Sequence, residues 1–354
     1  DDLKSLGYQP FLHADCIFWR EKEGIKVFLL IYVDDFLLIT STTVESDIQE
    51  IKSEIGKLYK IKDLGRAEYF LGINLEYSSG FIKLSQSTYI RKILERFRME
   101  QCKPVISPML PRALVSDREE MTNEETNNMM TTPYREAIGA LMFLSVRTRP
   151  DTSVAVENLA MHVQKPRNIH LEAVKRVFRY LQGTINEGLV ITAVPDEFFT
   201  LQVYADADWA TDVDNRRSRS GTVCQLGGNT IWWKSRKQNA VAASSCEAEY
   251  MALFESAKDT VWLRSLLCEF GYCPGSQPSL IHHDNQGSIA WATNDTVGRA
   301  KHISLRYHYT HDLIESGIIR LQYIESGANR AHCLTKPITG AQFQENKQSL
   351  GVRN

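Results

Sequence analysis

The sequence predicts a mixed α+β (α/β) fold, in which the C-terminal part forms a mixed sheet with helices on its faces. Strand-like patterns come first in this part, at residues 201–205, 221–226 and 230–234. A long helical pattern at 247–270 and an alternation of strand and helix patterns follow. Consecutive antiparallel strands followed by alternating helices and strands favour a mixed sheet covered by helices. At 354 residues, the chain is long enough for about two or three domains with cores of their own.

The composition is that of an ordinary globular protein, with 43% hydrophobic and 24% charged residues. A formal net charge of -2 gives no overall basic field, so nucleic-acid binding would need local basic patches. The seven cysteines form no CxxC pair and no signal peptide is visible, which favours a reducing, intracellular setting. The longest strongly apolar run, residues 27–33, is too short to span a bilayer.

The N-terminal segment, up to about Met109, begins with a hairpin that carries two acids. Apolar runs at 25–33 and 36–39 read as strands, and Asp34 and Asp35 lie between them, at the tip. Further along, the patterns predict a helix over 44–58, a hairpin over 69–84 that turns at Ser78-Ser79-Gly80, and a basic amphipathic helix over 89–97.

The middle of the chain changes character twice. A proline-rich stretch, 104–111, leads into polar residues 116–132, which we interpret as a linker or long loop. Residues 134–190 read as helical, and the last helix ends at Gly183. Basic residues lie off its apolar stripe and form either a solvated face or a face that contacts a nucleic-acid backbone: Lys175, Arg176 and Arg179.

After the long helical pattern, the last segment continues with a strand at 280–283 and a short helix. An amphipathic stretch at 307–314 and a strand at 318–324 complete it. Three acids lie where these elements begin or end: Asp206, Glu249 and Asp284. Carboxylates that recur at element ends favour convergence on a metal site, and two-metal phosphodiester hydrolysis needs such a set. The alternative is a set of unrelated surface and capping acids.

Two of these positions are ambiguous. Ser244 and Glu247 have the S-x-x-E spacing of a capping box, which would tie Glu247 to the helix start and leave Glu249 free as a ligand. Asp206 is nearer than Asp208 to the last strand residue, and we prefer it as the bridging ligand.

Local basic clusters offer candidate nucleic-acid contacts. A basic cluster in the loop after the first strand of the last segment comprises Arg216, Arg217 and Arg219. This loop is either simply solvated or contacts the phosphates of a nucleic acid. Lys234, Arg236 and Lys237 lie beside two tryptophans and combine charge with stacking area that suits a nucleic-acid strand. One of the two tryptophans is expected in the core or on a sheet face. The histidines lack cysteine partners at ligand spacing, which disfavours a zinc site: His282, His283, His302, His308 and His311.

Short motifs along almost the whole chain resemble one family. They include Tyr32-Val-Asp-Asp35, Lys62-Asp-Leu-Gly65, Tyr69-Phe-Leu-Gly72, Cys102-Lys-Pro104, Thr148-Arg-Pro-Asp151, Asp206-Ala-Asp-Trp209, Glu247-Ala-Glu-Tyr250, Asp284-Asn-Gln286, Lys301-His-Ile303 and Leu334-Thr-Lys-Pro337. In their order and spacing they resemble the C-terminal part of a Copia/Ty1-type LTR retrotransposon polyprotein: the end of the reverse transcriptase followed by ribonuclease H.

The resemblance implies three parts. Residues 1–110 correspond to a partial reverse transcriptase with a palm remnant, primer-grip hairpin and thumb start. Residues 111–195 correspond to a linker and helical thumb or connection region, and 196–354 to a ribonuclease H-like domain with a mixed five-stranded sheet and flanking helices. Asp34 and Asp35 match the paired palm acids, Asp34 as a metal ligand, while Leu71 and Gly72 match the primer grip. The chain reads like an internal fragment that lacks the fingers and an upstream palm carboxylate, so it should not polymerise alone.

In the ribonuclease H part, Asp206, Glu249 and Asp284 match three of the four family metal ligands, and Asn285 falls among the nucleic-acid contacts. The fourth position departs from the family, because His332 stands where relatives carry an aspartate. The histidine either marks a decayed site or binds the second metal directly or through water. Ser304 is a second departure, because relatives usually carry an acid there.

The resemblance therefore implies a ribonuclease H-type endonuclease that cleaves the RNA–DNA hybrid with two Mg²⁺ ions, Mn²⁺ being possible. The alternative is a catalytically decayed, nucleic-acid-binding remnant of a retroelement. The expected partners are the hybrid, the primer-template and the upstream polymerase and integrase parts of the polyprotein, with no membrane. The expected location is intracellular, in a cytoplasmic virus-like particle or the nucleus.

Overall fold

The computed structural model describes residues 2–111, 132–195, 198–212, 214–272, 277–294 and 304–354, together with Thr122, Glu125 and Met129. The chain forms two compact units. Unit 1 comprises Asp1–Phe70 and Trp262–Pro274, and unit 2 comprises Leu71–Val261 and Gly275–Asn354. The three-part division along the sequence stays a prediction, because compactness does not test which parts have separate functions.

Unit 1 contains an antiparallel sheet in the order β1 (Gln9–Pro10), β2 (Ile17–Lys22), β3 (Ile25–Tyr32) and β4 (Asp35–Thr40). Alternate residues of β3 pack against helices α1 (Asp2–Ser5) and α2 (Glu45–Leu58), because successive side chains of a strand point to opposite faces. The core of this unit comprises Leu3, Tyr8, Val27, Leu29, Ile51 and Ile55.

The predicted hairpin with acids at its tip is present in unit 1. Tyr32 pairs with Asp35, so the turn between β3 and β4 consists of Val33 and Asp34. Val33 adopts a left-handed backbone with φ 54°, which is strained for a β-branched residue. Both acids are exposed.

Unit 2 begins after β5 (Tyr69–Phe70) with the hairpin of β6 (Ile73–Ser78) and β7 (Phe81–Ser85). The turn lies at Ser79-Gly80, as predicted, and Gly80 supplies φ 84°. Strands β8 (Gly188–Thr192) and β14 (Val352–Arg353) pair onto β7 in that order. The helical prediction for 134–190 was therefore wrong at its end, because β8 begins at Gly188, where long-range pairing overrides local pattern.

Helices α3 (Ser87–Arg96), α5 (Tyr134–Ser145), α6 (Ser153–Ala160) and α7 (Asn168–Gly183) form the helical part of unit 2. The short 3₁₀ helix η1 (Pro150–Thr152) lies between α5 and α6. The prediction that the last of these helices ends at Gly183 is confirmed. Their apolar faces build one core, which includes Ile90, Leu94, Leu141, Leu144, Leu159, Val177, Phe178 and Leu181.

The predicted mixed five-stranded sheet with flanking helices is confirmed. Its order is β11 (Asn229–Lys237), β10 (Arg219–Leu226), β9 (Leu201–Asp208), β12 (Ser279–His283) and β13 (Ile319–Tyr323). The three strands that come first in the sequence pair antiparallel, whereas β12 and β13 add in parallel. Each predicted strand lies within three residues of the observed one at both ends.

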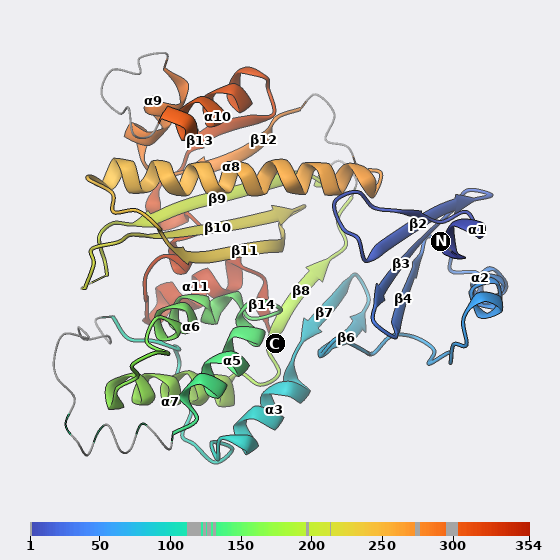
Figure 1. Cartoon of the computed structure of the whole chain (residues 1–354), viewed down its shortest axis with the longest axis horizontal. Helices are drawn as coiled ribbons and strands as arrows, with labels where there is room; N and C mark the ends of the chain where they lie inside the picture. The colour runs from blue at the N-terminus through green and yellow to red at the C-terminus, as the bar shows by residue number, and fades with distance from the viewer. Residues whose placement is uncertain are drawn as a thin grey trace. The chain divides into compact units, whose positions relative to one another are not determined.

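Helix α8 (Ser245–Glu269) begins in unit 2, where it packs on the sheet, and runs along the strands (Figure 1). The hydroxyls of Thr222 and Ser256 lie 2.8 Å apart across this contact. Helices α9 (Gln286–Thr293) and α10 (Ser304–Glu315) pack on each other and on β13. The 3₁₀ turn η4 (Ser326–Ala328) leads to the short 3₁₀ helix η5 (His332–Leu334). Helix η5 packs against β9 and β10 and also contacts α6 and α11 (Gly340–Ser349).

Most of the predicted linker at 116–132 lies outside the described residues. Among the helices that the structure describes, none is both long and apolar enough to cross a bilayer.

Candidate active site

Two of the three predicted carboxylates come from neighbouring strands of the mixed sheet, one within its strand and one directly after it. Strands β9 and β12 pair in parallel, with Ala205 opposite His283. The next residue on each strand is an acid, Asp206 on β9 and Asp284 after β12. The register therefore brings these two carboxylates to adjacent positions on one part of the sheet, although 78 positions separate them in the sequence.

The third carboxylate comes from the first turn of α8. Glu247 is tied to the helix start, because its carboxylate accepts the Ala243 N–H at 2.7 Å and its own N–H donates to Ser244 Oγ at 3.2 Å. This is the capping that the sequence spacing predicts. Glu249 is free of that role, and its carboxylate accepts a hydrogen bond from the backbone of Ala207 on β9.

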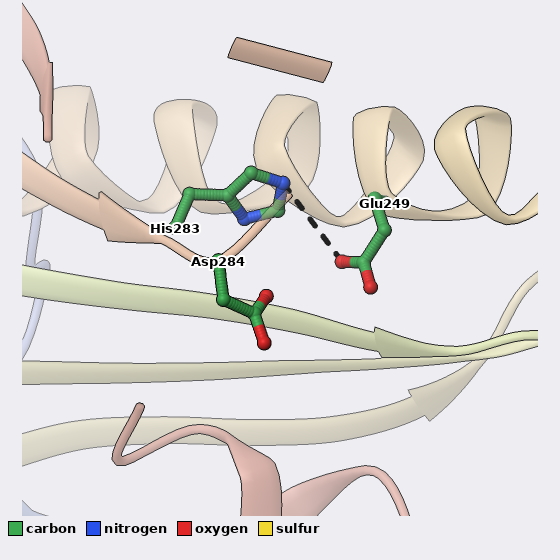
Figure 2. A group of neighbouring side chains, drawn as sticks. All are labelled: Glu249, His283 and Asp284. Carbon is green, nitrogen blue, oxygen red and sulfur yellow. Dashed lines mark ion pairs between the residues drawn. The ribbon is translucent and has the colours of Figure 1, made fainter. Parts of the chain in front are cut away.

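Glu249, His283 and Asp284 form one compact group, with their ligand-type atoms within 4.8 Å of one another. Figure 2 shows the imidazole and the two carboxylates converging from β12 and α8. His283 Nε2 lies 3.8 Å from Glu249 Oε2, and Nδ1 lies 3.1 Å from the Ala205 carbonyl oxygen. A hydrogen bond to that carbonyl places the proton on Nδ1 and leaves Nε2 as the lone-pair nitrogen. The sequence analysis disfavours a zinc site at His283 and gives this residue no other role. The one sequence signal that could have placed His283 in this group is its position directly before Asp284.

Asp206 is held from the other side by η5. Its side chain is 4% exposed, and Thr335 Oγ1 donates to Oδ2 at 2.5 Å. His332 Nδ1 lies 3.6 Å from the same oxygen. The sequence predicted His332 near this carboxylate, whereas it gave no separate role to Thr335.

Gly221 explains how η5 comes so close to the sheet. It pairs with Asp206, and a Cβ there would lie 2.8 Å from the Ala331 carbonyl oxygen and 2.9 Å from Thr335 Cγ2. Only glycine fits this approach without displacement of backbone. The buried Asn329 adds a bridge, because its Nδ2 donates to the Ala205 carbonyl at 2.8 Å.

The electrostatics show that the acids lie near one another. Burial and the negative charges of Asp206 and Asp284 raise the pKa of Glu249 to about 9. Burial, with Asp206 as a further cause, also raises the pKa of Asp208, although the charge of Lys336 opposes the shift. Three close carboxylates in a desolvated place favour protonation or a bound cation.

Several buried ligand-type atoms of this site make no hydrogen bond within the described part of the chain. They are Glu249 Oε2, Asp284 Oδ1, His283 Nε2 and His332 Nδ1. Buried polar atoms are normally satisfied, so a group of ligand-type atoms without protein partners at one place fits the binding of a cation. Oxygen donors suit Mg²⁺ or Mn²⁺, and the imidazoles suit Mn²⁺ better than Mg²⁺. The residues present therefore fit divalent cations.

The polymerase-type residues lie elsewhere. Asp34 and Asp35 belong to unit 1 and to none of the groups of three potential ligands found among the described residues. Leu71 and Gly72 form the turn before β6 and adopt left-handed backbones with φ 50° and 84°. Their roles stay predictions.

The basic residues divide into exposed and buried ones. Arg216 and Arg217 lie exposed on the loop between β9 and β10. The inclusion of Arg219 in this cluster was wrong, because Arg219 is 4% exposed on β10 and donates to Asn158 Oδ1 at 2.6 Å. Trp233 has the role expected for one tryptophan, because it packs partly buried against the core of the sheet and its indole N–H donates to the Ser145 carbonyl at 2.7 Å.

A basic cleft of about 60 Å³ lies between β10, β11, α8 and α10. Lys234 and Lys237 are partly neutralised there, by Asp259 at 3.5 Å and by Asp212 respectively. Gln238 links the cleft to the carboxylate site, because its Nε2 donates to the Ala248 carbonyl, one residue before Glu249. The cleft is lined by Ser220, Thr222, Lys234, Arg236, Lys237, Gln238, Asn239, Met251, Glu255 and Arg306.

Two further predicted features have local roles. Asn285 caps α9, because its Oδ1 accepts the Ser288 N–H at 2.9 Å. His311, Asp312 and Glu315 form a second group of potential ligands on α10, at one helix surface. His302 lies outside the described residues, as do the backbone and side chains of the Lys301-His-Ile303 motif.

Known proteins resemble the chain in sequence. The family model described as reverse transcriptase (RNA-dependent DNA polymerase) matches residues 1–111. The chain is 34% identical to the retrovirus-related Pol polyprotein from transposon TNT 1-94 of Nicotiana tabacum, over 99% of the chain and 26% of that protein. It is 31% identical to a putative transposon Ty5-1 protein of Saccharomyces cerevisiae, over 73% of the chain and 81% of that protein.

Among solved structures, the N-terminal RNase H domain of rv2228c from Mycobacterium tuberculosis is similar at 14% identity and a TM-score of 0.31. The match covers 43% of this chain and 98% of that one. The chain spans about a quarter of the length of the Pol polyproteins that it matches.

Proposed function

This chain belongs to the family of Copia-type LTR retrotransposon Pol polyproteins, and on that premise we propose that its carboxylate site is a ribonuclease H-type endonuclease site. The proposed reaction is the hydrolysis of a phosphodiester in the RNA strand of an RNA–DNA hybrid. The proposed cofactors are two Mg²⁺ ions, with Mn²⁺ as a substitute.

The observation that carries the proposal is the convergence of Asp206, Glu249 and Asp284 from β9, α8 and β12. Glu249 and Asp284 belong to one group of ligand-type atoms, and the charges of Asp206 and Asp284 raise the pKa of Glu249. Carboxylates so close together repel one another, and at neutral pH a divalent cation relieves that repulsion. An accidental set of surface acids would not share a partly buried place.

The three carboxylates would hold the cations, and His332 would join them from η5. Divalent cations held there would supply positive charge to stabilise the attacking hydroxide and the leaving 3′-oxygen. The chain itself fixes the ligands: Thr335 donates to Asp206, and Ser326 Oγ donates to Asp284 Oδ2. Such hydrogen bonds orient carboxylates before a ligand binds.

The second contribution of the chain is to bind the nucleic acid. The exposed Arg236 and the neighbouring Arg306 line the cleft beside the carboxylates, and Arg216 and Arg217 lie on the loop after β9. Cations in such positions contact phosphates and carry no sequence information. A hybrid would be distinguished from duplex DNA by its shape and by the RNA 2′-hydroxyls.

Unit 1 fits the polymerase part of the same polyprotein. The family model covers residues 1–111, and Asp34 and Asp35 lie at the tip of the β3–β4 hairpin. We infer that these acids, with Leu71 and Gly72, serve primer-template binding and DNA synthesis together with upstream polyprotein parts. The inferred location is intracellular, in a virus-like particle or the nucleus.

The test is cleavage of a labelled RNA–DNA hybrid by the full chain in Mg²⁺ and in Mn²⁺. We expect Asp206→Asn to lower the rate by about 10²-fold or more, because a metal ligand loses its charge. Asp312→Asn is the matched control, since Asp312 belongs to the other potential ligand group and should leave the rate unchanged. Cleavage that survives Asp206→Asn would reject the site, and binding of the hybrid without any cleavage would favour the decayed remnant.

A further inference from the structure

A buried ion pair lies in the helical part of unit 2, in a place that the proposed chemistry does not use. The side chains of Arg149 and Asp151 are both 0% exposed. The guanidinium donates to the carboxylate through Nε at 3.0 Å and through Nη2 at 2.7 Å. A pair buried this completely is retained only if its remaining hydrogen-bonding positions are satisfied.

Further groups on α7 and after it complete the pair. Tyr180 Oη donates to Asp151 Oδ2 at 2.6 Å. Arg149 donates to the carbonyl and the hydroxyl oxygen of Thr184, at 3.1 and 2.8 Å. Burial acts to raise the pKa of Asp151, but the charge of Arg149 and the hydrogen bonds outweigh it and hold the pKa below its ordinary value. The carboxylate is therefore charged and fixed in orientation.

This network lies directly behind η5, the element that carries His332. Asp151 belongs to η1, and η1 packs against η5. Cys333 of η5 is partly buried against the core that contains Ala331, Leu334 and Val223, and its thiol donates to the Arg330 carbonyl at 3.4 Å. Tyr180 also contacts Phe343 of α11, the helix that follows η5, with ring centroids 5.7 Å apart.

The opposite side of η5 is pressed against the sheet. Ala331 and Leu334 share a buried core with Val223 of β10, and Gly221 leaves no room between the strand and η5. Thus η5 packs against the mixed sheet on one side and against the helical part of unit 2 on the other. A shift of η1 or α7 in the helical part would move the side chains that reach Asp206, because packed interiors transmit displacements.

We propose that Arg149, Asp151 and Tyr180 are positioning residues, which hold η5 so that His332 and Thr335 meet Asp206. The network that joins η1 to the end of α7 is then an integral part of the nuclease site and not a connection appended to it. The inference rests on the proposed function for its catalytic consequence, whereas the placement of η5 can be measured without metal or substrate.

The test variant is Tyr180→Phe in the full chain, which removes one hydroxyl and leaves the ring packing intact. The readout is the rate at which Cys333 reacts with iodoacetamide in the folded, metal-free protein, followed by peptide mass spectrometry. We expect a rise of about tenfold at Cys333 and no change at Cys224, which is 0% exposed on β10. The internal comparison separates local loosening of η5 from global unfolding, which would expose both thiols.

Tyr134→Phe is the matched control. Tyr134 is 2% exposed in the same helical core, and its hydroxyl donates to the Leu159 carbonyl at 2.9 Å, within the helical bundle. We expect it to change neither thiol. Equal reactivity of Cys333 in the native chain and in Tyr180→Phe, or an equal rise at Cys224, overturns the proposal.

A second readout connects the network to the site. Calorimetric titration with Mn²⁺ should show affinity weakened about fivefold or more by Tyr180→Phe and unchanged by Tyr134→Phe. In the Thr335→Val background the effect of Tyr180→Phe should shrink, because both act through η5. A native chain that binds no Mn²⁺ would count against the proposed function alone, since the thiol measurement still decides the placement of η5.

Discussion

His332 and Asp206 face each other across the candidate site, with His332 Nδ1 3.6 Å from Asp206 Oδ2. Thr335 donates to the same oxygen, so the carboxylate is already oriented from η5. The imidazole nitrogen makes no hydrogen bond to any other described group. His332 thus occupies the place from which a fourth ligand would reach a cation on Asp206, and the consequences can be tested.

Replacement of this histidine should separate metal affinity from the stability of the metal-free protein. His332→Asp adds a fourth carboxylate to a buried acidic group, so we expect a lower melting temperature in EDTA and tighter Mg²⁺ binding. Differential scanning calorimetry with and without Mg²⁺ measures both effects. His308→Asp, on the exposed surface of α10, is the control and should show neither. Unchanged Mg²⁺ affinity would contradict a ligand position at 332.

Glu249 should be dispensable for folding and necessary for hydrolysis. Because its pKa is about 9 without metal, the side chain is neutral at pH 7, and Glu249→Gln replaces it with a neutral group of similar shape. We expect an equal or higher melting temperature in EDTA and a loss of hybrid cleavage of about 10²-fold or more. Hybrid cleavage assays and thermal unfolding provide the two measurements.

Glu247→Ala is the comparison for that variant. Glu247 accepts the Ala243 N–H at the start of α8, so its loss should lower stability by about 0.5–2 kcal/mol. Cleavage should continue below the melting temperature. If Glu247→Ala abolished cleavage and Glu249→Gln preserved it, Glu247 would be the metal ligand and Glu249 would not.

The metal-free protein should become less stable as the pH rises from about 5 to about 9. The folded-state pKa of Glu249 lies above the ordinary value of 4.5, so the folded protein binds more protons than the unfolded one between these values. The free energy of unfolding then falls with pH, by at most about 1.4 kcal/mol per pH unit for one proton. Urea unfolding in EDTA across this range measures the slope.

The matched measurement uses Glu249→Gln, in which the slope due to this group should disappear. Addition of Mg²⁺ to the native chain should also flatten the curve, since the cation stabilises the charged carboxylates. A slope that is the same in both chains would show that other groups cause it.

The close approach of η5 to the sheet predicts a strong effect at Gly221. Gly221→Ala places a methyl group 2.8 Å from a backbone oxygen, and we expect a loss of about 1–3 kcal/mol of stability with weakened Mn²⁺ binding. Gly139→Ala is the control, because Gly139 lies in α5 with nothing within 4 Å of the new Cβ. That change should stabilise the protein by about 0.5–1 kcal/mol. Denaturant unfolding and Mn²⁺ titration distinguish the two.

The basic cleft predicts a salt-dependent loss of hybrid binding. Arg236→Gln with Arg306→Gln should weaken binding of a hybrid in Ca²⁺, and the slope of log affinity against log salt should fall by about 1–2. Fluorescence anisotropy across salt concentrations measures both quantities. Arg135→Gln, an exposed change on α5, should alter neither. An unchanged slope would show that the cleft does not contact the bound hybrid.

Local patterns were sufficient for most of the elements. Alternating apolar residues predicted β9 to β13, and the S-x-x-E spacing predicted the capping role of Glu247, since both depend on near neighbours along the chain. The end of the helical segment was predicted wrongly because β8 forms by pairing with β7, about 105 residues earlier. Arg219 was predicted in the basic loop after the first strand, whereas it belongs to β10 and is buried against Asn158.

The sequence by itself determined the order of helices and strands and the family, and it identified Asp206, Glu249 and Asp284 as candidate ligands. Only the tertiary structure brought His283 to Glu249, set Thr335 on Asp206, and placed the Arg149–Asp151 pair behind η5. These contacts depend on strand register and on a close approach at Gly221, which join segments more than 30 residues apart. Local propensity contains no information about such distances, so only the folded chain decides them.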